Sequence, residues 1–141
     1  MPRVKIALPE TFSFSTKLTV RITDLNYGGH LGNDAVLSFI HEARMQYLKN
    51  LGLSELEFAG VGLIMSDVGI EFKNEAFFGD EITAFVGAGE FSRVGFELFY
   101  KLVKDEDQAP VAFAKTGMVC FDYTTRKVAP IPAEALAKLK G

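Results

Sequence analysis

Hydrophobic and polar residues alternate along several stretches of the chain, and a period of two is typical of β-strands that bury one face. The clearest case covers residues 11–23, where the apolar residues share one parity and the polar residues share the other. The apolar residues of this stretch are Phe12, Phe14, Leu18, Val20 and Ile22. Further strand patterns cover residues 62–73, 81–91, 93–104 and 111–123, with Ile64, Val68, Ile70 and Phe72 sharing one parity in the first of them. Short turns join these later strands, which favours antiparallel pairing.

The pattern changes to a helical one between residues 33 and 52. Its apolar positions form one wide face: Val36, Leu37, Phe39, Ile40, Ala43, Tyr47, Leu48 and Leu51. Asn33 or Asp34 is the predicted N-cap, and Gly52 is the predicted C-terminal stop. A second, short helix is expected at residues 132–140. One long helix over one face of an antiparallel sheet of about five strands defines an α+β class, and we expect a single domain over residues 1–141.

Composition narrows the classes of function. The 141 residues carry a net charge of −3, which argues against nucleic-acid or anionic-membrane partners. The lone cysteine, Cys120, rules out an internal disulfide, fits a reducing compartment and lies in an apolar run that predicts burial. The start of the chain does not read as a secretory signal, and the apolar stretch at residues 58–65 is far shorter than the roughly 20 residues of a membrane span. We therefore expect a soluble, cytoplasmic protein.

Polar chemistry concentrates in residues 24–34, "DLNYGGHLGND", between the first strand and the long helix. Glycines let backbone N–H groups approach a ligand closely, and a helix N-terminus adds unpaired N–H groups with partial positive charge. Such donors would stabilise an oxyanion formed at a carbonyl, and Gly29, with His30 or Leu31, is placed to supply them.

The element order and four local features resemble the hotdog-fold acyl-CoA thioesterases of the 4-hydroxybenzoyl-CoA thioesterase type. These features are "DLNYGGH", the helical "HEAR" followed by "YLKNLG", the turn "FFGD", and the exit "CFDYTTRKVAPIP". The resemblance covers roughly residues 16–131. It implies an antiparallel sheet wrapped around the long helix, hydrolysis of an acyl-CoA to free acid and CoA, and a homodimer or homotetramer with sites formed between protomers. It implies no cofactor.

Asn26 departs from the resembling pattern, where the second acid of D-x-D acts as nucleophile or general base. An amide cannot take a proton from water at neutral pH, so Asn26 is left to orient water or to donate to the carbonyl. The groups available to activate water are Asp24, His30, Asp34, Glu42 and Asp67. Structural roles stay open for all of them: a turn for Asp24, a loop or cap hydrogen bond for His30 and a cap for Asp34. Glu42 is open to a pair with Arg44 or Lys49 or to a position that faces the partner subunit, and Asp67 to an interface or solvated charge.

The candidate catalytic residues are Asp24, Asn26, Gly29 and His30. The candidate substrate-binding residues are Tyr27, Gly28, Leu31, Asp34, Glu42 and Asp67. Arg93, Lys101, Arg126 and Lys127 are candidates for the phosphates of CoA. The two histidines, with no second cysteine, do not indicate a metal site. Two alternatives remain open: a hotdog hydratase or dehydratase acting on acyl thioesters, which the spacing between Asp24 and His30 disfavours, and an acyl-CoA-binding module without catalysis.

Overall fold

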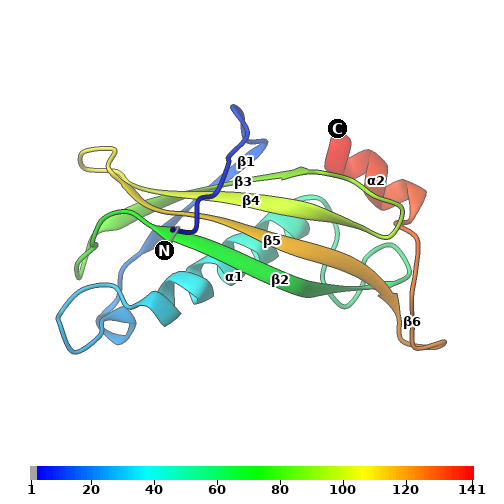
Figure 1. Cartoon of the computed structure of the whole chain (residues 1–141), viewed down its shortest axis with the longest axis horizontal. Coiled ribbons are helices and arrows are strands. Elements are labelled where there is room, and N and C mark those ends of the chain that lie inside the picture. The colour runs from blue at the N-terminus through cyan, green and yellow to red at the C-terminus, as the bar shows by residue number, and fades with distance from the viewer. Residues whose placement is uncertain (1–2) are drawn as a thin grey trace.

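The computed structural model describes residues 3–141 and confirms the α+β class with an antiparallel sheet. The elements are β1 (Phe14–Thr19), the 3₁₀ turn η1 (Ile22–Asp24), α1 (Asn33–Asn50), β2 (Gly62–Phe72), β3 (Glu81–Gly89), β4 (Gly95–Lys104), β5 (Pro110–Asp122), β6 (Lys127–Val128) and α2 (Ala133–Lys140). The strand order is β1-β3-β4-β5-β2, and the short β6 pairs with the end of β5. The sheet curves over α1, while the N-terminal segment crosses its other face (Figure 1).

The first strand is shorter than the alternation predicts, and the prediction for Ile22 is wrong. β1 ends at Thr19, and the chain turns through η1. The side chain of Asp24 accepts hydrogen bonds from the backbone and the guanidinium of Arg21, which closes this turn. The turn directs Ile22 outward, where 68% of it is exposed, whereas Val20 is fully buried.

The long helix begins and ends near the predicted residues, but its N-cap is neither Asn33 nor Asp34. Both lie in the first helical turn, the N-cap is Gly32, and no side chain among the described residues caps the helix. The C-terminal prediction is confirmed: Gly52 has a φ of +76°, and the N–H of Leu53 donates to the carbonyl of Leu48 at 2.8 Å.

The core lies between the sheet and α1, which is closest to β1 and β3. Its largest fully buried side chains include Ile40 and Leu48 from α1 and Ile82, Leu98 and Leu102 from the sheet. Cys120 is buried, as predicted, and burial raises the pKa of its thiol to about 11.

A chain of polar groups crosses this core. The hydroxyl groups of Tyr100 and Thr116 lie 2.7 Å apart, and Arg44 donates to the Tyr100 hydroxyl at 3.3 Å. The carboxylate of Glu55 lies 3.3 Å from Nε of Arg44 and 3.0 Å from Nε2 of His41. Of the roles left open for Glu42, the pair with Arg44 does not form, because Glu55 is the ionic partner of Arg44 and Glu42 accepts a hydrogen bond from Gln46.

A β-bulge in the edge strand β2 changes which residues face the helix. Met65 pairs with Met118 and Asp67 pairs with Gly117, so one additional residue, Ser66, stands between them. After the bulge Val68 lies opposite the buried Thr116. Ile64 consequently faces away from α1, whereas Val68, Ile70 and Phe72 face the helix side. The prediction that all four side chains share one face is therefore wrong.

The bulge also places Asp67 on the outer face of the sheet, away from α1. The hydroxyl of Ser66 donates to the Asp67 carboxylate at 2.8 Å and lies 3.1 Å from the carbonyl oxygen of Gly117. A Cβ atom on Gly117 would collide with the carboxylate of Asp67. Gly117 therefore provides the space in which the Asp67 side chain lies.

Candidate functional site

The glycine-rich loop is a compact turn held by its own backbone. The N–H of Asn26 donates to the carbonyl of His30 at 2.9 Å, and the N–H of Gly29 donates to the carbonyl of Asn26 at 3.0 Å. The side-chain oxygen of Asn26 accepts from the N–H of Gly28 at 2.9 Å. Because the Gly29 N–H is already engaged, it is not a free donor for an oxyanion. Gly29 instead supplies the left-handed conformation of the turn, with a φ of +81°.

Asp24 has a structural role in this structure. Its side chain is buried, its carboxylate accepts from the backbone of Arg21 at 2.8 Å, and its carbonyl accepts from the N–H of Gly32 at 3.0 Å. These bonds join η1 to the start of α1. Asp24 does not line the cavity beside the loop, so the geometry favours the turn-forming interpretation over a role as base.

A cavity of about 260 Å³ lies where the loop and the first turn of α1 meet the segment that follows β2. Its lining residues are His30, Leu31, Asn33, Val36, Phe72, Lys73, Asn74, Glu75, Ala76 and Val111. The loop is tied to this segment by a hydrogen bond from the N–H of Leu31 to the carbonyl of Ala76 at 2.7 Å. The cavity therefore brings together residues that are far apart in the sequence.

The polar groups of the cavity include a histidine and a carboxylate in contact. Nε2 of His30 lies 3.0 Å from Oε2 of Glu75, and 32% of the His30 side chain is exposed. The ring of His30 packs edge-on against Phe77. Glu75 was not predicted as a site residue, because one glutamate in the turn "NEAFFGD" carries no local signal. Only the long-range pairing of that turn with the loop brings it to His30.

The N-terminus of α1 opens toward the same cavity. Asn33, its first helical residue, lines the cavity, and no described side chain caps the helix. The first N–H groups of a helix lack intrahelical partners and carry partial positive charge. A Cβ atom on Gly32 would lie 2.7 Å from a carboxylate oxygen of Asp34, so glycine at this position leaves room for that carboxylate at the start of the helix. This end can polarise a carbonyl placed in the cavity.

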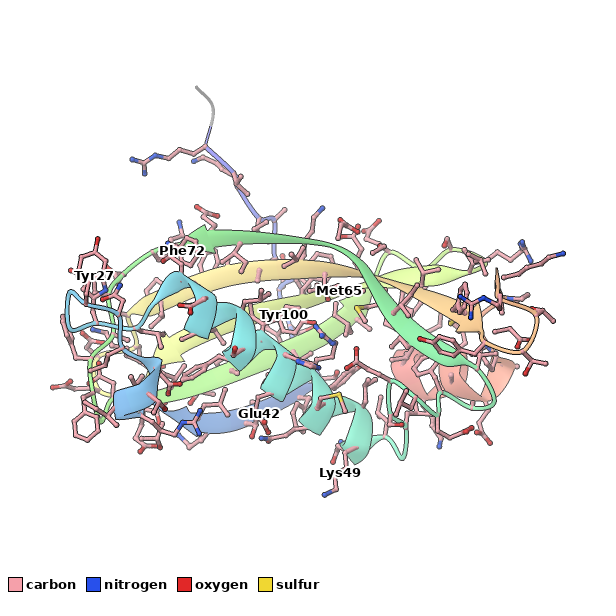
Figure 2. The ribbon with its side chains drawn as sticks, turned by 90° about the horizontal axis from the view of Figure 1, so that it is seen from below. Tyr27, Glu42, Lys49, Met65, Phe72 and Tyr100 are labelled. Carbon is pink, nitrogen blue, oxygen red and sulfur yellow. The ribbon has the colours of Figure 1, made fainter. Side chains whose placement is uncertain are left out.

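The other predicted site residues are dispersed. Tyr27 is fully exposed at the tip of the loop, and Glu42 lies midway along α1 (Figure 2). Asp34 is exposed in the first turn of the helix, and Asp67 is on the outer face of the sheet. Of the predicted substrate-binding residues, Leu31 alone is among those lining the cavity, and Gly28 lies against His30, with 3.3 Å between its Cβ position and Nε2.

The cations predicted to meet the phosphates of CoA lie elsewhere. Arg126 and Lys127 follow the end of β5, whereas Val111 in the cavity wall is near its start. Lys101 lies in a shallow hollow with Phe12 and Phe85. Lys73 is the cation among the residues that line the cavity, and its ammonium pairs at 2.9 Å with Glu71, which does not line it.

An antiparallel sheet that curves over one long helix is the hotdog fold. The family model described as "Thioesterase-like superfamily" matches residues 20–139, and the chain belongs to that family. No curated protein matches the sequence. No described helix combines the length and apolarity required to cross a bilayer.

Solved structures support the same fold. A 1,4-dihydroxy-2-naphthoyl-CoA thioesterase from Synechocystis is 24% identical with a TM-score of 0.83, and the alignment covers 90% of this chain and 95% of that one. A probable thioesterase from Escherichia coli is 22% identical with a TM-score of 0.78 and coverages of 89% and 96%. A DHNA-CoA thioesterase from Staphylococcus aureus is 19% identical with a TM-score of 0.78 and coverages of 89% for both chains.

Proposed function

We propose that the chain is an acyl-CoA thioesterase, and that residues 1–141 act as one hotdog domain which hydrolyses a thioester to free acid and CoA. The observation that carries the proposal is the cavity against the uncapped N-terminus of α1. Family membership supports the reaction class, and the names of the similar structures support a CoA thioester as substrate.

The chemistry follows from the position of the helix end. A thioester carbonyl in the cavity would meet the first backbone N–H groups of α1 beside Asn33. Attack of water on the carbonyl carbon places negative charge on its oxygen, and preorganised N–H donors stabilise that charge more than they stabilise the ground state. Asn26 is not among the residues that line the cavity, so we assign it to holding the loop rather than to attacking the substrate.

Release of free thiol from a series of acyl-CoA substrates tests the proposal directly. We expect turnover with at least one acyl group, and Asn33→Phe should suppress it because an aromatic side chain at this exposed position would obstruct the cavity. Ser38→Phe is the matched control, since Ser38 is exposed on α1 but does not line the cavity.

Two results would contradict hydrolysis. Binding of acyl-CoA without thiol release across the series would indicate a binding module. A change in absorbance of an enoyl-CoA without thiol release would indicate a hydratase.

We also propose that the chain forms a homodimer through β2. This strand is at one edge of the sheet, and its helix side carries Met65, Val68 and Phe72, of which 38%, 38% and 49% are exposed. Exposed strand edges with apolar side chains are sites of association. Because Phe72 also lines the cavity, a partner protomer on this edge would cover part of the cavity wall. Light scattering should give about twice the chain mass of 15.5 kDa, and a stable monomer at micromolar concentration would contradict the dimer.

A further inference from the structure

Thioester hydrolysis needs a group that takes a proton from water, and neither Asn26 nor Asp24 is placed to do so. Asn26 is an amide whose side-chain oxygen accepts a hydrogen bond from the N–H of Gly28. Asp24 is buried and bonded to Arg21. His30 and Glu75, by contrast, both line the cavity, and their side chains are in contact with each other.

The backbone on both sides fixes this pair. Leu31, which follows His30, donates its N–H to the carbonyl of Ala76, which follows Glu75. His30 and Phe77 form an isolated antiparallel bridge, and their rings lie 6.5 Å apart in an edge-on arrangement. The imidazole and the carboxylate thus belong to residues that line the same cavity as Asn33, the first residue of α1.

The pair contributes little to the stability of the fold. The side chain of Glu75 is 61% exposed, and that of His30 is 32% exposed. Ion pairs with this much exposure are screened by solvent and stabilise proteins weakly. A histidine oriented by a carboxylate beside a cavity is, however, an arrangement suited to general base catalysis.

We propose that His30 is the general base that activates water, and that Glu75 is a positioning residue that orients the imidazole and stabilises its protonated form. This inference rests on the proposed thioesterase function. With Nε2–H donating to Glu75, Nδ1 of the same ring is free of a proton and can accept one.

The imidazole of His30 passes through its protonated form during the reaction. Nδ1 of His30 takes a proton from water, and the water oxygen forms a bond to the carbonyl carbon. The tetrahedral intermediate then breaks its carbon–sulfur bond, and the departing thiolate takes the proton from the imidazolium. The products are the free acid and CoA thiol, and His30 returns to its neutral form.

Other charges around His30 have partners of their own. Lys73 lines the cavity but pairs with Glu71 and lies over the ring of Phe113 at 5.0 Å. Lys104 lies 5.9 Å from the ring centroid of Phe77, which packs against His30. Among the described residues, Glu75 is the carboxylate in direct contact with the imidazole.

The test compares kcat and KM for thiol release as a function of pH in wild type, His30→Gln, Glu75→Gln and Glu75→Asp. We expect His30→Gln to lower kcat by roughly 10²-fold or more, which is the usual contribution of a general base. Glu75→Gln should lower kcat by about tenfold and should shift the acid limb of the profile to lower pH, because the imidazolium loses its counter-charge. Glu75→Asp should restore part of both effects.

Glu106→Gln is the matched control, because Glu106 is exposed in the β4–β5 turn and does not line the cavity. Its profile should equal that of wild type. Far-UV circular dichroism and the unfolding midpoint check that each variant is folded. Wild-type kcat in folded His30→Gln would overturn the assignment of the base while leaving the thioesterase function in place. An unshifted profile in Glu75→Gln would overturn the role of Glu75, and a wild type that releases no thiol would overturn both proposals.

Discussion

Removal of the Tyr100 hydroxyl tests whether the buried polar chain stabilises the fold. Tyr100 and Thr116 are fully buried, and the Tyr100 oxygen contacts Thr116 at 2.7 Å and Arg44 at 3.3 Å. Tyr100→Phe keeps the ring in place but leaves the Thr116 hydroxyl and an Arg44 amino group without this partner. A buried polar group left without a partner costs about 1–3 kcal/mol. We therefore expect Tyr100→Phe to lower the free energy of unfolding by about 2 kcal/mol.

The same loss can be expressed as a change in melting temperature. An unfolding entropy of about 2.1 cal/mol/K per residue over 141 residues gives about 300 cal/mol/K. A loss of 2 kcal/mol then corresponds to a decrease of about 7 °C. Urea denaturation and calorimetry at one fixed protein concentration measure both quantities, and the fixed concentration removes the effect of self-association. Tyr27→Phe is the control, since Tyr27 is fully exposed and its hydroxyl stays in water.

A double-mutant cycle with Thr116→Val isolates the contact between the two hydroxyl groups. Thr116→Val alone should cost about 1 kcal/mol, because Tyr100 keeps Arg44 as a partner. In Tyr100→Phe/Thr116→Val neither hydroxyl is left unpaired, so the double variant should lose about 1 kcal/mol less than the sum of the single losses. Additive losses within about 0.5 kcal/mol would refute the coupling that we infer from the 2.7 Å distance.

Three further variants test local features. Asn26→Asp should keep or raise the rate of thiol release, because a carboxylate accepts the Gly28 N–H as the amide does; a lower rate in a folded variant would contradict this. Gly29→Val should lower the free energy of unfolding by about 1–2 kcal/mol, measured as a lower urea midpoint, because valine is strained in the left-handed region. Gly29→Asn should lower the midpoint less, because asparagine tolerates that region better. Equal midpoints for the two variants would argue against backbone strain. Burial raises the pKa of Cys120 to about 11, so the unfolded chain loses this thiol proton at lower pH than the folded chain, and the free energy of unfolding should fall between pH 9 and 11. Cys120→Ala should make that fall shallower in urea titrations at several pH values, and an unchanged slope would contradict this prediction.

Features determined by local sequence were predictable. The strand patterns in residues 81–104 correspond to β3 and β4, and the glycine at position 52 ends α1. Both signals are local, because alternation is seen within one short stretch and a left-handed backbone is a property of a single glycine. The incorrect predictions involve interactions that no short window contains. Ile22 is exposed because Asp24 closes a 3₁₀ turn, and the parity of β2 changes at a bulge that depends on pairing with β5.

In the candidate site too, the features set by local sequence were predictable and those set by long-range contacts were not. His30 could be predicted because it stands in a loop rich in glycine and polar residues. Glu75 could not, since its proximity to His30 results from pairing between that loop and the turn after β2. The hydrogen bond from the N–H of Gly29 to the carbonyl of Asn26 could not be predicted either, because the composition of a loop does not specify which backbone donors its turns use.

The space above Gly117 has a consequence for the evolution of this sheet. The carboxylate of Asp67 occupies the position that a side chain at residue 117 would need, and Ser66 holds the carboxylate there. A lineage that gains any side chain at position 117 must therefore expel or replace the acid at position 67. The two positions, 50 apart in the chain and paired across β2 and β5, should change together among related sequences. Covariation at this pair would thus report a packing constraint on the sheet and would not indicate that Asp67 takes part in catalysis.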